Sequence, residues 1–139
     1  MALVNFFNED INFKLSHPRK TAKWVKDAIL KERRAIKSLN IVFCSDRYLA
    51  DINFQYLNHT TFTDIVTFNQ SDNPKVLEGD IFISVERVRE NAEKFDDSFD
   101  NELHRVIIHG VLHLIGFDDK SKAKKMIMRK KEDAYLSLR

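Results

Sequence analysis

The chain has 139 residues, of which 43% are hydrophobic and 32% charged, so it has the composition of a globular domain rather than a disordered chain. It has no apolar run long enough to span a bilayer, and its N-terminus lacks the basic start and long apolar middle of a signal peptide. A net charge of +2 does not by itself indicate a nucleic-acid-binding protein. We therefore expect one domain over residues 1–139, located in the cytoplasm.

The first two thirds of the chain mix strand-like and helix-like patterns. Alternating, β-branched or aromatic residues predict four short strands, at residues 4–10, 38–46, 64–69 and 79–86. Apolar residues at helical spacing predict two helices, at residues 16–36 and 47–58. Ser16 is a candidate cap for the first helix, and Pro18 suits its first turn.

From about residue 84 the chain is mostly helical, in three pieces with breaks near Asp97 and at Gly116–Asp118. Strands followed by a helix-rich C-terminal half indicate an α+β fold. We expect a small mixed sheet of about four strands covered by helices. The order and direction of the strands do not follow from the sequence.

Cys44 is the single cysteine, so no internal disulfide can form, and a reducing compartment fits this usage. Its place in a strand-like segment predicts an inert core thiol, and a nucleophile is the alternative. Residues 120–131 hold seven basic residues and no acidic one, whereas residues 90–102 are strongly acidic. Such blocks are either solvated helix faces or, for the basic block, a surface that faces phosphate.

The stretch "HGVLHLIGFDD", residues 109–119, carries the strongest signal. His109 and His113 lie about 40° apart around a helix, so their rings can converge on one zinc ion. Gly116 can end that helix in a left-handed turn and return the chain to the histidines, which gives the spacing of the metzincin zinc motif with Asp119 as third ligand. Asp118 is the competing ligand. The alternative interpretation is a buried apolar helix that carries two histidines.

Several neighbouring residues bear on the chemistry. Metalloproteases with this motif carry a glutamate general base directly after the first histidine, where this chain has Gly110. Asp64 and Asp118 are candidates for orienting a histidine ring. The alternative for Asp64 is a role at a strand end, and the alternative for Asp118 is a role in a turn or as a helix cap. His104 points about 140° away from His109 around the helix, which favours a core or surface position.

The same stretch resembles the hallmark of the YbeY family of bacterial endoribonucleases, His-Gly-x-Leu-His-Leu-x-Gly-aromatic-Asp-His. It differs at the last position, where the third histidine of the family is Asp119 in this chain. Residues 51–68 resemble the family segment that ends in Pro-Thr-Asp-Val-Leu-Ser-Phe, with Phe62 in place of the proline. Residues 79–84, "GDIFIS", resemble its Gly-Asp-Ile-x-Ile-Ser strand.

The resemblance implies a zinc-dependent endoribonuclease that cuts single-stranded RNA in ribosomal RNA maturation and ribosome quality control. It implies one Zn²⁺ per chain, held by His109, His113 and Asp119, with a metal-bound water in the fourth position. Its partners would be precursor ribosomal RNA and, among proteins, ribosomal proteins or a ribosome-associated GTPase. The basic block then supplies the candidate RNA contacts Lys124, Lys125, Arg129 and Lys130.

The family usually carries an arginine where this chain has Leu57, and His59 is the nearest substitute. Two other functions stay open. One is a metal-dependent hydrolase of another class, such as a metallopeptidase, against which Gly110 argues. The other is a ribosome-associated binding module with a structural metal.

Overall fold

The computed structural model describes residues 3–57 and 63–139. Its first half holds β1 (Val4–Asn8), α1 (Pro18–Lys31), β2 (Ala35–Cys44), α2 (Asp46–Leu57), β3 (Ile65–Asn69) and β4 (Val76–Ser84). Three helices follow, α3 (Val85–Lys94), α4 (Phe99–Ile115) and α5 (Lys122–Leu136). Across these ranges no helix has the length and apolar character needed to cross a membrane.

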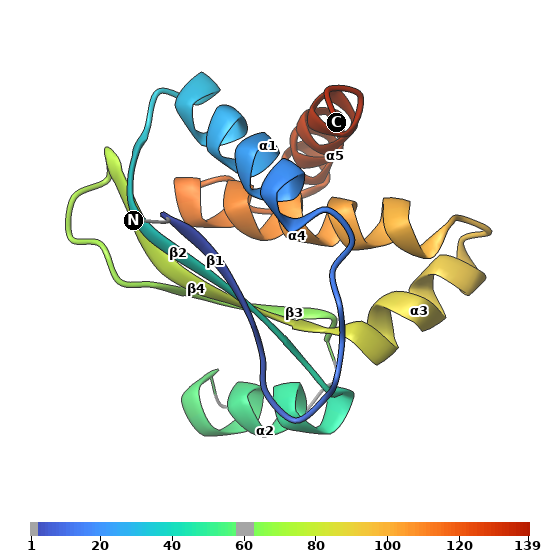
Figure 1. Cartoon of the computed structure of the whole chain (residues 1–139). Coiled ribbons are helices and arrows are strands. Elements are labelled where there is room, and N and C mark those ends of the chain that lie inside the picture. The colour runs from blue at the N-terminus through green and yellow to red at the C-terminus, as the bar shows by residue number, and fades with distance from the viewer. Residues whose placement is uncertain (1–2, 58–62) are drawn as a thin grey trace.

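The strands form one sheet in the order β1-β2-β4-β3. β1 pairs with β2 and β2 with β4 in parallel, whereas β3 runs antiparallel to β4. Figure 1 shows α1, α4 and α5 stacked on one face of this sheet, α2 alone on the other face, and α3 at one end. The expected α+β fold with a small mixed sheet and a helix-rich C-terminal half is therefore confirmed.

α4 is the central helix of the core. It is buried along most of its length, through Leu103, Val106, Ile107, Ile108, Val111 and Leu112. Burial of each such side chain contributes about 1.5–3 kcal/mol relative to exposure. Gly110 lets the helix approach the sheet closely, since a Cβ there would lie 2.7 Å from the side chain of Ile65 and 3.1 Å from that of Ile81. The packing of α4 on β3 and β4 fixes where its histidines lie.

The first helix differs from the expectation at both ends. His17, not Ser16, occupies the cap position, in a left-handed conformation with φ of 53° and without a side-chain capping bond. Pro18 in the first turn is confirmed. The helix ends at Lys31 because Arg33 adopts a φ of 61°, and this left-handed residue turns the chain into β2. Residues 35–36, expected in the helix, therefore begin the strand.

Two residues with reactive side chains belong to the core. Cys44 is buried in β2, which confirms its expected place in the core, and burial together with nearby carboxylates raises the pKa of its thiol to about 12, which disfavours the nucleophilic thiolate. His104 is buried on α4, where its Nδ1–H donates to the carbonyl of Asp100 at 2.7 Å and its Nε2 lies 3.3 Å from the hydroxyl of Thr21. His104 is thus a satisfied core histidine, away from the face of His109.

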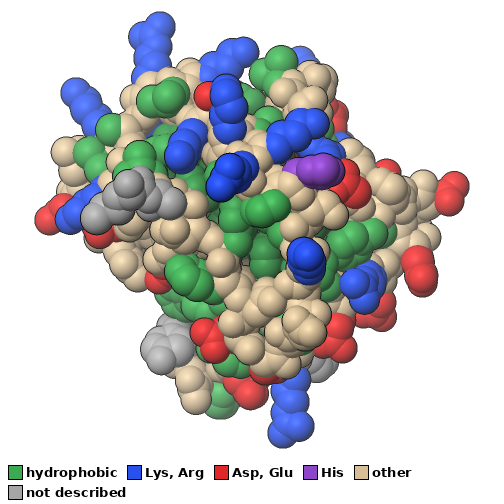
Figure 2. Space-filling model, viewed as in Figure 1, with side chains coloured by type: hydrophobic (Ala, Val, Ile, Leu, Met, Phe, Trp, Pro, Cys, Tyr) green, Lys and Arg blue, Asp and Glu red, His purple; other side chains and the backbone are tan. Residues whose placement is uncertain are grey.

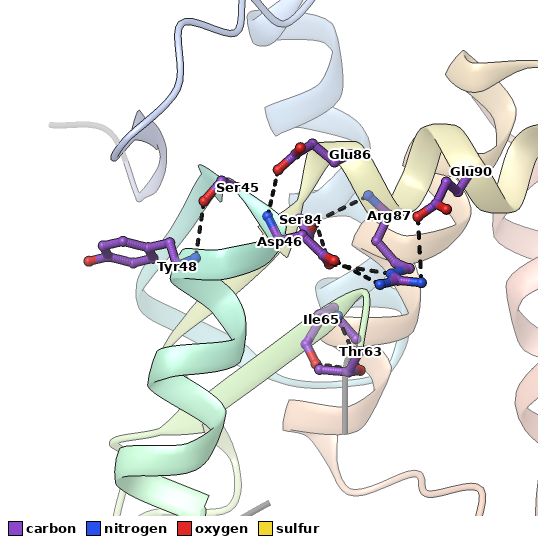
Figure 3. Close-up of polar contacts among 9 residues, drawn as sticks. All are labelled: Ser45, Asp46, Tyr48, Thr63, Ile65, Ser84, Glu86, Arg87 and Glu90. Atoms are coloured by element: carbon purple, nitrogen blue, oxygen red, sulfur yellow. Dashed lines mark hydrogen bonds and ion pairs between the residues drawn. The ribbon is translucent and has the colours of Figure 1, made fainter. Parts of the chain in front are cut away.

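A polar clamp joins the ends of β2 and β4 to the helices that follow them (Figure 3). The Arg87 guanidinium donates to the Asp46 carboxylate, with Nη2 at 2.7 Å from Oδ2 and Nε at 3.3 Å from Oδ1. Ser84 caps α3 by accepting from the backbone N–H of Arg87 at 3.1 Å. The backbone N–H of Ser84 also donates to the carbonyl of Asp64 at 3.0 Å, so the clamp positions the start of β3.

Candidate active site

A polar pocket of about 310 Å³ lies between α4, α5 and the start of β3. It is lined by Asp64, Glu102, Arg105, Val106, His109, Asp119, Lys125, Met128, Arg129 and Glu132. Most of these side chains are charged, which is unusual for a concave surface between packed helices. The fold therefore brings His109 and Asp119 to one cavity, together with Asp64 from β3.

The histidines lie on neighbouring turns of α4. The ring centres of His109 and His113 are 6.0 Å apart, and the planes meet at 67°. Two rings that share one tetrahedral ion, with Zn–N bonds of about 2 Å, have centres roughly 5 Å apart, so this pair is near that spacing. His109 is partly buried and His113 exposed. Within residues 3–57 and 63–139, no three His, Cys, Asp or Glu side chains already stand in a metal-holding arrangement, so the three-ligand set stays a prediction.

Gly116 ends α4 as expected. Its φ is 121°, and the backbone N–H groups of Gly116 and Phe117 donate to the carbonyls of His113 and Leu112 at 3.1 Å each. This pattern is the Schellman motif, which satisfies the last carbonyls of a helix and reverses the chain direction. The turn brings Asp119 to the pocket of His109.

Asp118 has a local role in this turn. Its Oδ1 accepts from the backbone N–H of Lys120 at 3.0 Å, and its Oδ2 lies 3.3 Å from Nζ of Lys124. These hydrogen bonds hold the pKa of the Asp118 carboxyl below its usual value. Ser121, rather than Asp118, caps α5 by accepting from the N–H of Lys124 at 3.1 Å. Of the two local roles considered for Asp118, the structure therefore shows the turn and not the cap.

Glu132 on α5 is hydrogen-bonded to His109, and the sequence interpretation missed it. Its Oε2 accepts a hydrogen bond from Nδ1 of His109 at 2.7 Å, and its Oε1 accepts from Nη1 of Arg105 at 3.0 Å. The side chain is 6% exposed. Glu132 lies on the buried stripe of α5 with Met128 and Tyr135, at helical spacing. A charged residue on an apolar stripe was the signal that could have identified it.

Burial and neighbouring charges shift the pKa values of the side chains in this pocket, in part in opposite directions. Burial raises the pKa of Asp64, although the nearby charge of His109 acts to lower it. Burial also raises the pKa of Glu102, and the charge of Asp64 adds to this effect. Glu102 is 6% exposed, and the charges of Arg105 and Arg129 only partly offset the effect of burial on its pKa. Burial lowers the pKa of His109, but the hydrogen bond and charge of Glu132 outweigh this effect, so the pKa lies above its usual value.

The four candidate RNA-binding residues divide into two groups. Lys125 and Arg129, one turn apart on α5, line the pocket of His109. Lys124 pairs with Asp118, and Lys130 lines a separate groove between α1 and α5. On the face shown in Figure 2, most Lys and Arg side chains lie over the layer of α1 and α5, and acidic side chains gather toward α3.

Two positions that the family resemblance singled out have side chains outside the described parts of the chain. Leu57 is the last residue of α2, and its side chain lies outside the described parts of the chain. His59, the nearest substitute for the family arginine, falls in residues 58–62, which are also outside them.

The fold and the pocket define a small α+β domain with a charged, histidine-bearing cavity between two helices. Residues 4–138 match the family model described as Endoribonuclease YbeY, and the chain therefore belongs to the YbeY family. This result confirms the resemblance found in residues 109–119.

Individual relatives agree with the family match. A protein of Flavobacterium psychrophilum named Endoribonuclease YbeY is 48% identical over 95% of this chain and 94% of its own length. A protein of the same name from Cytophaga hutchinsonii is 46% identical over 98% and 95%. A solution structure from Thermotoga maritima has a TM-score of 0.67, covers 96% of this chain and 87% of its own, and is 24% identical, so it shows the same fold.

Proposed function

We propose that this protein is a zinc-dependent endoribonuclease that cleaves single-stranded RNA in the cytoplasm, in ribosomal RNA maturation and ribosome quality control. Membership of the YbeY family supports the nuclease class. The observation that carries the proposal is the pocket of His109, where potential metal ligands and the cations Lys125 and Arg129 share one cavity. Its partners would be precursor ribosomal RNA and, on the protein side, ribosomal proteins or a ribosome-associated GTPase.

The chemistry of the donor set fits a zinc ion. Two imidazoles and one carboxylate are ligands that zinc accepts, and His109, His113 and Asp119 would hold it. Nδ1 of His109 is already engaged by Glu132, so Nε2 is the nitrogen left for a ligand. When bound, zinc lowers the pKa of a water molecule to about 7 and polarises a phosphoryl oxygen.

The residues of the chain itself supply binding and orientation. Lys125 and Arg129 lie on the wall of the pocket that α5 forms, where they can bind phosphate groups of an RNA strand. Glu132 and Arg105 hold the ring of His109 in place. Asp64 and Glu102, whose pKa values are raised by burial, are groups that can hold a proton inside the same cavity.

The structure gives a physical reason to prefer this function over a peptidase. Gly110 occupies the position of the metalloprotease glutamate, and it faces the sheet rather than the pocket. A Cβ there would already lie 2.7 Å from Ile65 and 3.1 Å from Ile81, so a glutamate has no room. The third function, a binding module with a structural metal, is disfavoured by the open, charged pocket, because structural zinc sites are closed by four protein ligands.

The test compares cleavage of a labelled single-stranded RNA with digestion of casein. We expect wild-type protein to cut the RNA and leave casein intact, and a chelator to abolish the cleavage. His113→Ala should be inactive, whereas His17→Asn, which changes an exposed histidine outside the pocket and keeps a residue that tolerates its left-handed backbone, should retain activity. Equal cleavage by the two variants would overturn the proposal.

A further inference from the structure

Glu132 lies between two hydrogen-bond donors from the neighbouring helix. One is Nη1 of Arg105 at 3.0 Å and the other is Nδ1 of His109 at 2.7 Å, each on its own carboxylate oxygen. The Arg105 side chain is 15% exposed and that of Glu132 is 6% exposed, so water competes little for these bonds. Arg105 also forms an ion pair with Asp133, whose Oδ1 accepts from Nη2 at 2.7 Å.

We propose that Glu132, itself held by Arg105, is a positioning residue that fixes His109 in the Nδ1–H tautomer. A carboxylate can only accept hydrogen bonds, and an arginine can only donate them. Oε1 is taken by Arg105, which leaves Oε2 to accept from His109. Nδ1 of the neutral ring must therefore carry the proton, and Nε2 keeps its lone pair.

The geometry also links α5 to the orientation of the ring. Arg105 and His109 are one turn apart on α4, while Glu132 comes from α5. The ring of His109 is thus fixed by the docking of a second helix and not by its own helix alone. For metal binding this inference rests on the proposed function, since partners that orient a ligating histidine usually change metal affinity by 10–100-fold.

The substitution Glu132→Gln separates this role from a general effect on packing. The amide has one acceptor atom and one donor group, and Arg105 can only donate, so the amide oxygen pairs with Arg105. The amide NH₂ then faces Nδ1 of His109, which must become an acceptor. We expect the ring to switch to the Nε2–H tautomer, in which the lone pair needed by a metal is blocked.

Two further variants serve as controls. Asp133→Asn removes the same charge from the adjacent position, which also contacts Arg105 but is 58% exposed and makes no bond to His109 among the described residues. The double variant Arg105→Met/Glu132→Gln removes the donor that sets the orientation of the amide, so the amide oxygen is again free to accept from Nδ1 of His109. It should bring back the Nδ1–H tautomer in a share of the molecules, which a merely destabilised pocket would not do.

The experiment measures the tautomer of His109 by long-range ¹H–¹⁵N NMR of the metal-free protein at alkaline pH, where the ring is neutral. It then measures Co²⁺ affinity by titration of the visible absorption of the ion. We expect Nδ1–H in wild type and in Asp133→Asn, and a share of it in the double variant. We expect Nε2–H in Glu132→Gln, with Co²⁺ affinity weakened about 10–100-fold.

An Nδ1–H tautomer in Glu132→Gln, with wild-type affinity, would overturn the inference. A switched tautomer with unchanged affinity would overturn the positioning role. Failure of the proposed function has a different signature, in which the wild type binds neither Co²⁺ nor Zn²⁺ while His109 still shows the Nδ1–H tautomer.

Discussion

The division of the basic block into two groups leads to a quantitative prediction about RNA binding. Lys125 and Arg129 line the pocket of His109, whereas Lys124 pairs with Asp118 and Lys130 lies in another groove. The double variants Lys125→Gln/Arg129→Gln and Lys124→Gln/Lys130→Gln remove the same charge from the same helix. Only the first pair should remove direct contacts with phosphate.

The magnitude follows from counterion release. Each phosphate contact on a single strand contributes about 0.7 to the slope of log K against log salt, so loss of two contacts should lower the slope by about 1.4. For a fourfold change in salt, this difference corresponds to roughly a sevenfold difference in the loss of affinity. The control pair acts only through long-range charge, which salt screens.

The assay is fluorescence anisotropy of a labelled single-stranded RNA at several salt concentrations, with each variant checked for folding by circular dichroism. The expected result is a shallower slope for Lys125→Gln/Arg129→Gln and a nearly unchanged slope for Lys124→Gln/Lys130→Gln. Equal changes in both pairs, or no change in either, would refute the assignment of the pocket wall as the phosphate-binding surface.

Three further predictions concern stability. Gly110→Ala should destabilise the fold by up to about 2 kcal/mol in urea unfolding, because overpacking against fully buried Ile81 opposes a gain of about 1 kcal/mol in helix propensity; greater stability than wild type would contradict the close packing of α4. Glu102→Gln should raise the melting temperature by a few degrees at neutral and alkaline pH, and the gain should vanish in acid. The reason is that the folded-state pKa of Glu102 is raised, so its ionised form disfavours folding only above the unfolded value; a gain that is independent of pH would refute this. Burial lowers the pKa of His104 and therefore disfavours the charged ring in the folded protein. The free energy of unfolding should then fall as the pH drops below about 6.5, more steeply in wild type than in His104→Gln. Parallel profiles in the two proteins would argue against a buried neutral ring.

Local chemistry made part of the site predictable from sequence. The histidine spacing, the helix end at Gly116 and the turn role of Asp118 depend on residues a few positions apart, and the structure shows this local geometry. The angle of His104 around the helix predicted a position away from His109, either in the core or on the surface, and the structure places it in the core.

Contacts between distant segments were not predictable in this way. The bond from His109 to Glu132 spans 23 residues and depends on how α5 docks against α4. The strand order likewise depends on packing between segments distant in the sequence. The division between Lys125 and Lys124 depends on the helical phase of α5 relative to the pocket, which the sequence pattern of a basic block does not fix.

The central claim is a zinc site at the pocket of His109, and elemental analysis of the purified protein tests it most directly. We expect about one zinc per chain in wild type and in Asp118→Ala, whose carboxylate is held in a turn. His113→Ala and Asp119→Ala, each verified to be folded, should lose the metal. Wild-type protein without zinc after reconstitution, or full zinc content in both ligand variants, would contradict the account.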